Sequence, residues 1–496
     1  MGNDHLQQIR IILLPIYDSM FPNPELRTRN SEPGTLTRNS EFSSLKPFSK
    51  YHTDIRASFL LAYPVMLSQL GHVMMGVADN VMVGHIGAKQ IAAAGLANVA
   101  FNVLMLFGIG VSYAITPLVA TADGEKNIKG VNETLRHGFV INVVNSLVLV
   151  AIVFFGKNLL YHIGQPEEVV VLSIPYLEII TFSLIPILIF QTFRQFSEGL
   201  SNTWVPMVIV LSCNVLNIGL NYMLIYGHYG FPELGLNGAG WATFISRIVM
   251  GVSLAGYIYF APRFRDYRPG FLIGKYSKEL FNKMLHIGLP AGLQFIFEVA
   301  AFDFSLVMMG WIGTTALAAH QIAINLATIS YMTTSGLAAA ATIRVSNELG
   351  KGDIKALRKV AFVLIGMAMS FMTAWGIIFI FGRNFLPHLY VEDMDVITLA
   401  GPLIIIAGLF QLSDGLQVVC AGALRGLQDV KVPSVFIFIS YWIIGLPLGY
   451  WLGFHTRLGP VGIWMGLLIG LTLTASAMFW RFNYLSKKIL NSRVEV

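Results

Sequence analysis

Long apolar segments recur along the chain from about residue 58 to residue 480, and short polar, glycine- or proline-containing turns separate them. Crossing the hydrocarbon core of a bilayer as a helix takes about 20 apolar residues. Twelve windows of sufficient length occur, at 58–83, 92–121, 138–156, 168–192, 204–227, 237–261, 284–311, 316–343, 360–382, 396–424, 432–453 and 460–480. The pattern therefore predicts an all-α membrane protein with twelve transmembrane helices.

Composition agrees with this prediction. Of the 496 residues, 55% are hydrophobic and 12% are charged, and the mean hydropathy is +0.65. A soluble protein has about twice that charged fraction. The net charge of +6 is not a sign of nucleic-acid binding, because the charges lie between the apolar segments. The two cysteines, Cys213 and Cys420, lie inside apolar segments, where we expect small buried side chains.

Basic residues are distributed unevenly between the two sides of the predicted membrane. If the N-terminus is cytoplasmic, 28 of the 33 Lys and Arg residues lie in inside segments, including Arg194 and Arg425. Four lie in outside loops, and Arg247 lies within the sixth window. Cytoplasmic loops of membrane proteins carry this excess of positive charge. We therefore expect both termini in the cytoplasm.

An internal repeat divides the twelve windows into two groups of six. An offset of 226 places Pro64 on Pro290 and Gly124 on Gly350, and an offset of 227 places 199–200 on 426–427. Because six is an even number, both halves share one orientation, as in several secondary transporters with a central cavity. The predicted fold is two pseudo-symmetric six-helix bundles.

The predicted domain organisation follows from these windows and from the polar composition of the chain ends. It comprises a disordered cytoplasmic tail (1–53), an N-terminal lobe (54–270), a cytoplasmic linker (271–283), a C-terminal lobe (284–482) and a cytoplasmic C-terminal tail (483–496).

Acidic residues inside the apolar windows are the strongest functional candidates, because an uncompensated charge in a bilayer is costly. Glu298 lies near the middle of the seventh window without a basic neighbour at i±3 or i±4. Such a carboxylate binds a cation, carries a proton or makes a structural hydrogen bond. Asp414 gives the tenth window a similar polar patch, and the two acids would hold one cation or share a proton if they meet.

A second group of candidates lies in the first half. Asp79 lies towards the outer end of the first window, where it is either a site residue or a solvated interfacial acid. Asn217 and Asn221 are four residues apart and share a helix face, and Thr243 lies in the sixth window. Their oxygens suit Na⁺ or a proton-linked network with Asp79. Hydrogen bonding between helices is the alternative.

Three further residues are candidates for lining a substrate cavity, namely Asp303, Gln294 and His320. Asp303 follows Glu298 by five residues, which places it about 140° further round the helix. It either lines the cavity or makes a structural hydrogen bond. For His320, packing or a hydrogen-bond network is the favoured role over metal binding.

Together, these features and several short motifs resemble the multidrug and toxic compound extrusion (MATE) family, and its NorM-like bacterial branch in particular. The resemblance covers residues 57 to 482, and its motifs are VADNVMVG at 77–84, SEGL at 197–200, the segment 289–298, AAHQIA at 318–323, IRV at 343–345 and the segment 417–429, which ends in LRGLQD. It implies a twelve-helix antiporter that expels cationic, amphiphilic drugs or dyes in exchange for Na⁺ or H⁺, with no other cofactor.

The same resemblance assigns roles to residues. The coupling acids of the C-terminal lobe match Glu298 and Asp414, and this match favours Na⁺. The N-terminal site matches Asp79, Asn217, Asn221 and Thr243, so that Na⁺ would bind at one site or the other. Asn221 stands where other branches carry an aspartate, which argues against a proton-only mechanism at the N-terminal site.

The sequence is also compatible with other functions. The nearest is a lipid-linked oligosaccharide flippase or a narrow-specificity metabolite exporter of the same superfamily. No catalytic or phosphate-binding motif is visible in the sequence, so we expect a carrier and not an enzyme. We expect a monomer in the inner or plasma membrane, whose partners are small molecules and the lipid bilayer and not nucleic acid.

Overall fold

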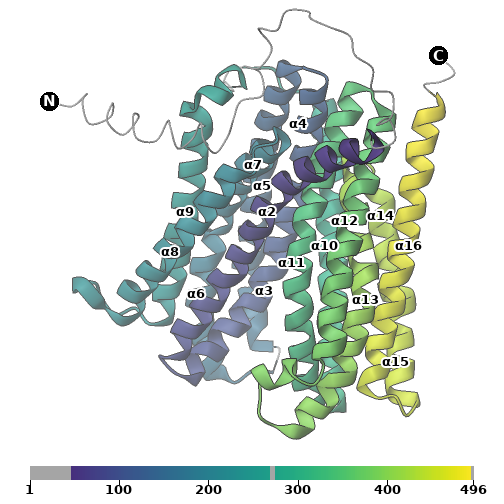
Figure 1. Cartoon of the computed structure of the whole chain (residues 1–496). Helices are drawn as coiled ribbons and strands as arrows, with labels where there is room; N and C mark the ends of the chain where they lie inside the picture. The colour runs from purple at the N-terminus through teal and green to yellow at the C-terminus, as the bar shows by residue number, and fades with distance from the viewer. Residues whose placement is uncertain (1–45, 163, 268–273, 493–496) are drawn as a thin grey trace, which may run out of the picture. The chain divides into compact units, whose positions relative to one another are not determined.

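The computed structural model describes residues 46–162, 164–267 and 274–492, with side chains from His52 onward. Every regular element in this part of the chain is helical (Figure 1). The helices are α2 (Lys46–Gly84), α3 (Ala88–Ser112), α4 (Ile115–Gly124), α5 (Ile128–Gly156), α6 (Glu167–Phe182), α7 (Leu184–Gly199), α8 (Trp204–Tyr226), α9 (Leu236–Phe260), α10 (Lys278–Ile312), α11 (Thr314–Lys351), α12 (Ile354–Gly382), α13 (Met394–Gly426), α14 (Lys431–Ile437), α15 (Leu446–His455) and α16 (Pro460–Ser492). A π-helical segment, Phe438–Gly445, joins α14 to α15.

Eleven segments of the described chain are helical, long and apolar enough to cross a bilayer. Two of them consist of two α-helices each, since α3 continues into α4 and α6 into α7. A third joins α14 to α15 through the π-helical segment. The twelfth expected window lies on α11, which has 38 residues but is too rich in Thr, Ser, His and Gln to qualify by hydropathy. Several of its polar side chains, such as His320, Ser330 and Thr334, are buried against other helices, whereas Gln321 is exposed.

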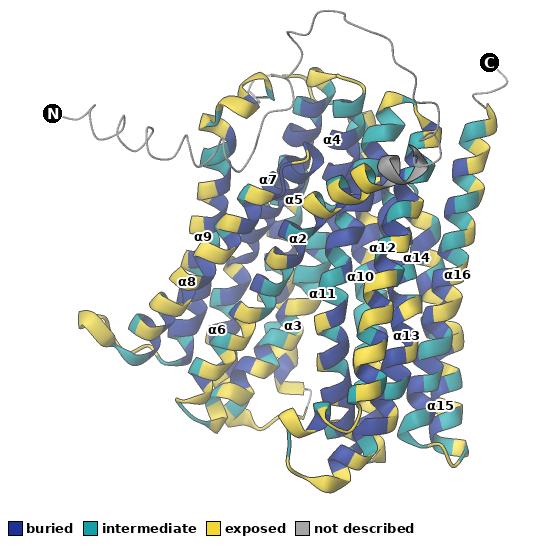
Figure 2. Ribbon diagram, viewed as in Figure 1, coloured by how far each residue is buried: buried dark blue, intermediate teal, exposed yellow. Residues whose placement is uncertain are grey.

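The burial pattern fits a protein surrounded by lipid. The outward faces of helices such as α8 and α9 are exposed, whereas every residue from 191 to 200 on and after α7 is buried (Figure 2). The exposed side chains include large apolar ones, such as Phe155 and Phe381, each 83% exposed. An apolar surface of this extent is stable only in contact with lipid or another protein.

Two hydrophobic cores divide the described helices into two lobes, but α2 and α10 belong to both. In Figure 1, α2 runs diagonally from the C-terminal half of the molecule to the N-terminal half. Accordingly Ala62 and Met66 of α2 pack in the C-terminal core, whereas Met75 packs in the N-terminal core. In the reverse sense, Ile287 of α10 packs in the N-terminal core and Met308 in the C-terminal core. The two lobes therefore exchange the first halves of their first helices.

The glycine contacts between helices confirm the internal repeat. A Cβ atom at Gly110 would overlap Gly292 on α10, and one at Gly336 would overlap Met66 on α2. Both members of the second pair lie 226 residues from their counterparts in the first. Close helix approach at small residues is a common packing mode in membranes. The repeated sequence thus produces a repeated contact.

The same symmetry appears where α4 meets α11. A Cβ at Gly124 would overlap the carbonyl oxygen of Asn347, and a Cβ at Gly350 would overlap that of Thr121. The Asp123 carboxylate reinforces this contact by accepting hydrogen bonds from Asn347 (3.1 Å) and from Tyr267 (3.3 Å). These helix ends lie on the side of the molecule that we expect to face the cytoplasm.

Helix boundaries differ from the windows at three places. The helix α10 begins at Lys278, inside the expected linker 271–283, and Ser277 caps it by accepting a hydrogen bond from Leu280 N (3.4 Å). The helix α16 continues to Ser492, ten residues into the expected C-terminal tail, and α2 begins at Lys46, inside the expected tail 1–53. The apolar windows predict only the part of each helix that lies within the membrane. The helices themselves continue beyond it through polar turns. The remainder of the N-terminal tail lies outside the described residues.

Candidate functional site

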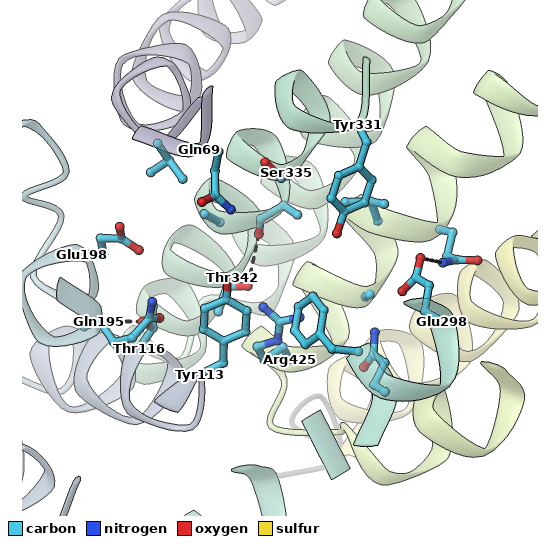
Figure 3. A pocket seen from close by; sticks show the side chains of 18 of the residues that line it. Gln69, Tyr113, Thr116, Gln195, Glu198, Glu298, Tyr331, Ser335, Thr342 and Arg425 are labelled. Carbon is cyan, nitrogen blue, oxygen red and sulfur yellow. Dashed lines mark hydrogen bonds between the residues drawn. The ribbon is translucent and has the colours of Figure 1, made fainter. Parts of the chain in front are cut away.

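A pocket of about 80 Å³ lies between the two lobes. Side chains from α2, α4, α7, α10, α11 and α13, together with Tyr113 between α3 and α4, line it (Figure 3). Because both cores contribute walls, a rocking motion of the lobes would change its shape and access. This is the position that a substrate cavity takes in transporters built from two repeats.

Four charged side chains line this pocket. Arg194 and Glu198, four residues apart on α7, form an ion pair in which Arg194 Nε lies 2.7 Å from Glu198 Oε1, and each side chain is 5% exposed. Arg425 lies with its guanidinium 4.7 Å from the centre of the Tyr113 ring. Glu298 lies on the other side of Arg425 from Glu198 in Figure 3. The formal charges of the four residues sum to zero.

The C-terminal lobe brings its two predicted acids together. Gln417 donates a hydrogen bond from Nε2 to Glu298 Oε1 (2.7 Å), and the Tyr441 hydroxyl donates to Gln417 Oε1 (3.3 Å). Asp414, one turn before Gln417, is buried and interacts electrostatically with Glu298. Tyr441 belongs to the π-helical segment, a distortion often found at functional sites. The cluster offers carboxylate, amide and phenol oxygens to a cation.

Asp414 differs from Glu298 in its hydrogen bonding. Over the residues that the structure describes, Asp414 accepts no hydrogen bond from protein. A buried carboxylate without donors is stable when it is protonated or when a cation is bound. The pair therefore has the chemistry of an ion site.

The N-terminal lobe brings together all four predicted residues of its site. Asp79 Oδ1 accepts a hydrogen bond from Asn221 Nδ2 (2.5 Å), and Asp79 Oδ2 accepts one from Thr243 Oγ1 (3.2 Å). Asn217 accepts from Asn221 (3.2 Å) and donates to Thr243 (3.5 Å). Both oxygens of Asp79 thus have donors, in contrast to the carboxylate of Asp414. Asn221 Oδ1 is buried without a partner in the described chain and is the free oxygen of this site.

The three predicted cavity residues behave differently. Gln294 lines the pocket. His320 is buried away from it and accepts a hydrogen bond from Trp464 Nε1 (3.1 Å), which is the network role favoured by the sequence. Asp303 is exposed on α10 and does not line the pocket, because its offset from Glu298 turns it to another face of the helix.

The sequence pattern does not reveal the role of Arg194, Glu198 and Arg425. The prediction that the two arginines lie in segments between the membrane spans is wrong, since both lie in helices and line the pocket. The helix ends that carry them lie beside glycines and polar residues, which resemble a turn in the sequence. One signal was available, because the 227-residue repeat places Arg425 on Glu198, and opposite charges at equivalent positions point to an electrostatic role.

Arg247, to which the sequence gave no role, lies in the N-terminal lobe. It donates a hydrogen bond to Ser183 Oγ (2.6 Å) and lies 5.0 Å from the centre of the Phe101 ring. It also interacts electrostatically with Asp79. Because this fixed positive charge partly compensates the negative charge of Asp79, the carboxylate depends less on a bound cation for its stability.

Comparison with known proteins gives consistent matches. The model of the MatE family matches residues 64–223 and 290–451, so its two copies begin at the repeated prolines. Two similar proteins are named "Probable multidrug resistance protein NorM". The one from Rhizobium meliloti is 34% identical over 460 residues, with 92% of this chain and 98% of the relative covered. The one from Rhodopseudomonas palustris is 35% identical over 450 residues, with 90% and 95% covered.

Solved structures show the same fold. A MATE protein crystallised in the bent conformation superposes with a TM-score of 0.82 at 18% identity, covering 89% of this chain and 99% of that one. The eukaryotic MATE transporter AtDTX14 superposes with a TM-score of 0.77 at 20% identity, covering 88% of this chain and 98% of that one. The arrangement of helices described above is therefore shared with these proteins.

Proposed function

This chain belongs to the MatE family of membrane transporters, and we propose that it is an antiporter that exports cationic, amphiphilic drugs or dyes in exchange for Na⁺ or H⁺. The two relatives described above are named as probable multidrug resistance proteins, which supports the export of drugs. The observation that carries the coupling proposal is the Glu298–Asp414 pair, in which Asp414 is buried and Glu298 also lines the pocket between the lobes. We propose a monomer in the inner or plasma membrane with cytoplasmic termini.

The proposed mechanism is competition for the C-terminal acids. Glu298 belongs both to the ion cluster, through Gln417, and to the pocket lining. A coupling ion at Glu298 and Asp414 removes the negative charge that holds a cationic substrate. Exchange follows when ion and substrate stabilise different orientations of the lobes, because only differential binding shifts a conformational equilibrium. The close approach of α4 and α11 at Gly124 and Gly350 supports the part of this proposal in which the expected cytoplasmic side is the closed one.

The flippase alternative receives no comparable support. A lipid-linked pyrophosphate requires a cavity with net positive charge, whereas the formal charges of the two arginines and two glutamates that line this pocket sum to zero. Arg194 is moreover paired directly with Glu198.

Dye transport in inverted membrane vesicles tests the proposed function. Ethidium movement is measured while a Na⁺ gradient and a pH gradient are imposed separately. We expect accumulation of ethidium in the vesicles when the Na⁺ gradient is directed outward from them, and none without either gradient. Absence of gradient-dependent movement of ethidium and of other cationic dyes would reject the antiport proposal.

Replacing Asp79 with asparagine tests the contribution of the N-terminal site to transport. Asparagine keeps an oxygen for the donors Asn221 and Thr243 but removes the charge. Because those donors and Arg247 already compensate Asp79, we expect a loss of ethidium transport of about fivefold, at the low end of typical coupling energies. Initial rates at equal protein amounts are the measurement. A loss as complete as that from removing Glu298 would contradict this ranking of the two sites.

A further inference from the structure

Arg425 is the least compensated charge in the pocket. It lies near the end of α13, and its only close interaction within the described chain is with the face of the Tyr113 ring, 4.7 Å away. Its Nε atom is buried and has no hydrogen-bond partner among the described residues. Arg194, by contrast, donates from Nε to Glu198 at 2.7 Å. The two arginines of one pocket therefore differ in whether the protein neutralises them.

The pocket glutamates are engaged elsewhere. Glu198 is the partner of Arg194, and Glu298 accepts from Gln417. Glu298 interacts with Arg425 electrostatically, but the two form no ion pair within 4.0 Å in the described chain. A guanidinium presents five N–H donors in a planar fork that matches a carboxylate or phosphate. The fork of Arg425 is thus available to an anionic group from outside the protein.

Aromatic rings line the pocket near this cation. Tyr113 and Phe295 pack edge to face with ring centres 5.5 Å apart, and Tyr331 lines the same pocket. Figure 3 shows Arg425 beside Tyr113, with Glu298 further along. A molecule with an aromatic body, an anionic group at one end and a cationic group at the other complements all three features.

We propose that Arg425 binds an anionic group of the transported molecule and thereby selects aromatic zwitterions over purely cationic analogues. This inference rests on the proposed function, since it assigns a substrate class to the same pocket. The cationic end of the zwitterion meets Glu298, where it competes with the coupling ion, whereas the anionic end is held independently of that exchange. Arg425 is a binding residue for specificity and takes no part in ion coupling.

Two related dyes provide the test. Rhodamine 110 carries a free carboxyl group, and rhodamine 123 is its methyl ester, so the pair differs in the anionic group alone. Binding of each dye to the purified full-length protein is followed by fluorescence polarisation. We expect wild type to favour the free acid, and Arg425→Gln to lower the ratio of free-acid to ester affinity about tenfold, as loss of a charge-assisted hydrogen bond predicts. Arg425→Lys should retain part of the preference.

Arg457→Gln is the matched control, because it removes the same charge from an exposed position. It should leave the ratio at the wild-type value. Equal affinity of wild type for both dyes, or an equal loss for both in Arg425→Gln, would overturn the inference. Failure of wild type to bind or transport either dye would instead reject the proposed function. If Arg425→Gln does not fold, the wild-type preference and its reduction in Arg425→Lys decide the question.

Discussion

Glu298→Gln is expected to abolish ion-dependent efflux, with a loss of ethidium transport of about 100-fold or more. Glutamine keeps the size of the side chain and an oxygen for Gln417, but it removes the charge that attracts both the coupling ion and the cationic substrate. Because the same carboxylate would serve both ligands, one substitution removes both the driving interaction and the cargo site. A coupling energy of about 3 kcal/mol corresponds to this loss. Gradient-driven uptake by inverted vesicles is the measurement.

Asp303→Asn is the matched control for this prediction. It removes an acid from the same helix, but Asp303 is exposed and does not line the pocket. Transport by Asp303→Asn should therefore stay near the wild-type rate. Full activity of a well-expressed Glu298→Gln protein would refute the coupling role of Glu298 and direct attention to Asp79.

Gly124→Ala is expected to shift the protein away from the conformation in which α4 and α11 touch. The added Cβ would overlap the carbonyl oxygen of Asn347, and a backbone atom cannot rotate away as a side chain can. Overpacking costs about 1–3 kcal/mol, which shifts a two-state equilibrium by about 5-fold to 150-fold. Spin labels at the exposed positions Glu125 and Lys351 would report a new population of longer distances between the helix ends.

Gly366→Ala provides the comparison, because a Cβ at this helical glycine has nothing within 4 Å. The two native cysteines are buried, so they should not compete for the labels. Gly350→Ala, at the equivalent position of the repeat, should reproduce the effect of Gly124→Ala. A distance distribution in Gly124→Ala that matches wild type would show that this contact does not close the expected cytoplasmic side.

The sequence predicted the helices and the two acid clusters because both rest on strong local signals. A carboxylate such as Glu298 inside an apolar window is conspicuous, and the spacing of Asn217 and Asn221 places them on one helix face. The repeat predicted two bundles, and the reciprocal contacts of Gly124 and Gly350 confirm it.

What the sequence could not supply is the neighbour of each helix. Hydropathy shows that α2 spans the membrane, but not that it passes from one core to the other. The charged residues of the pocket could not be predicted from the sequence for the same reason. Arg194 and Arg425 lie near helix ends whose glycine and polar neighbours resemble loops in the sequence, whereas the structure places both in helices that line the pocket.

The exchange of helices between the lobes constrains how the chain can be assembled during synthesis. A ribosome that has released the first six spans has not yet produced Ile287 and Ala291, which belong to the N-terminal core. The same nascent chain already contains Ala62 and Met66, which belong to the C-terminal core, but the rest of that core has not been synthesised. Neither half can complete its own interior, so the two six-span halves expressed as separate polypeptides should mature only when they are made together.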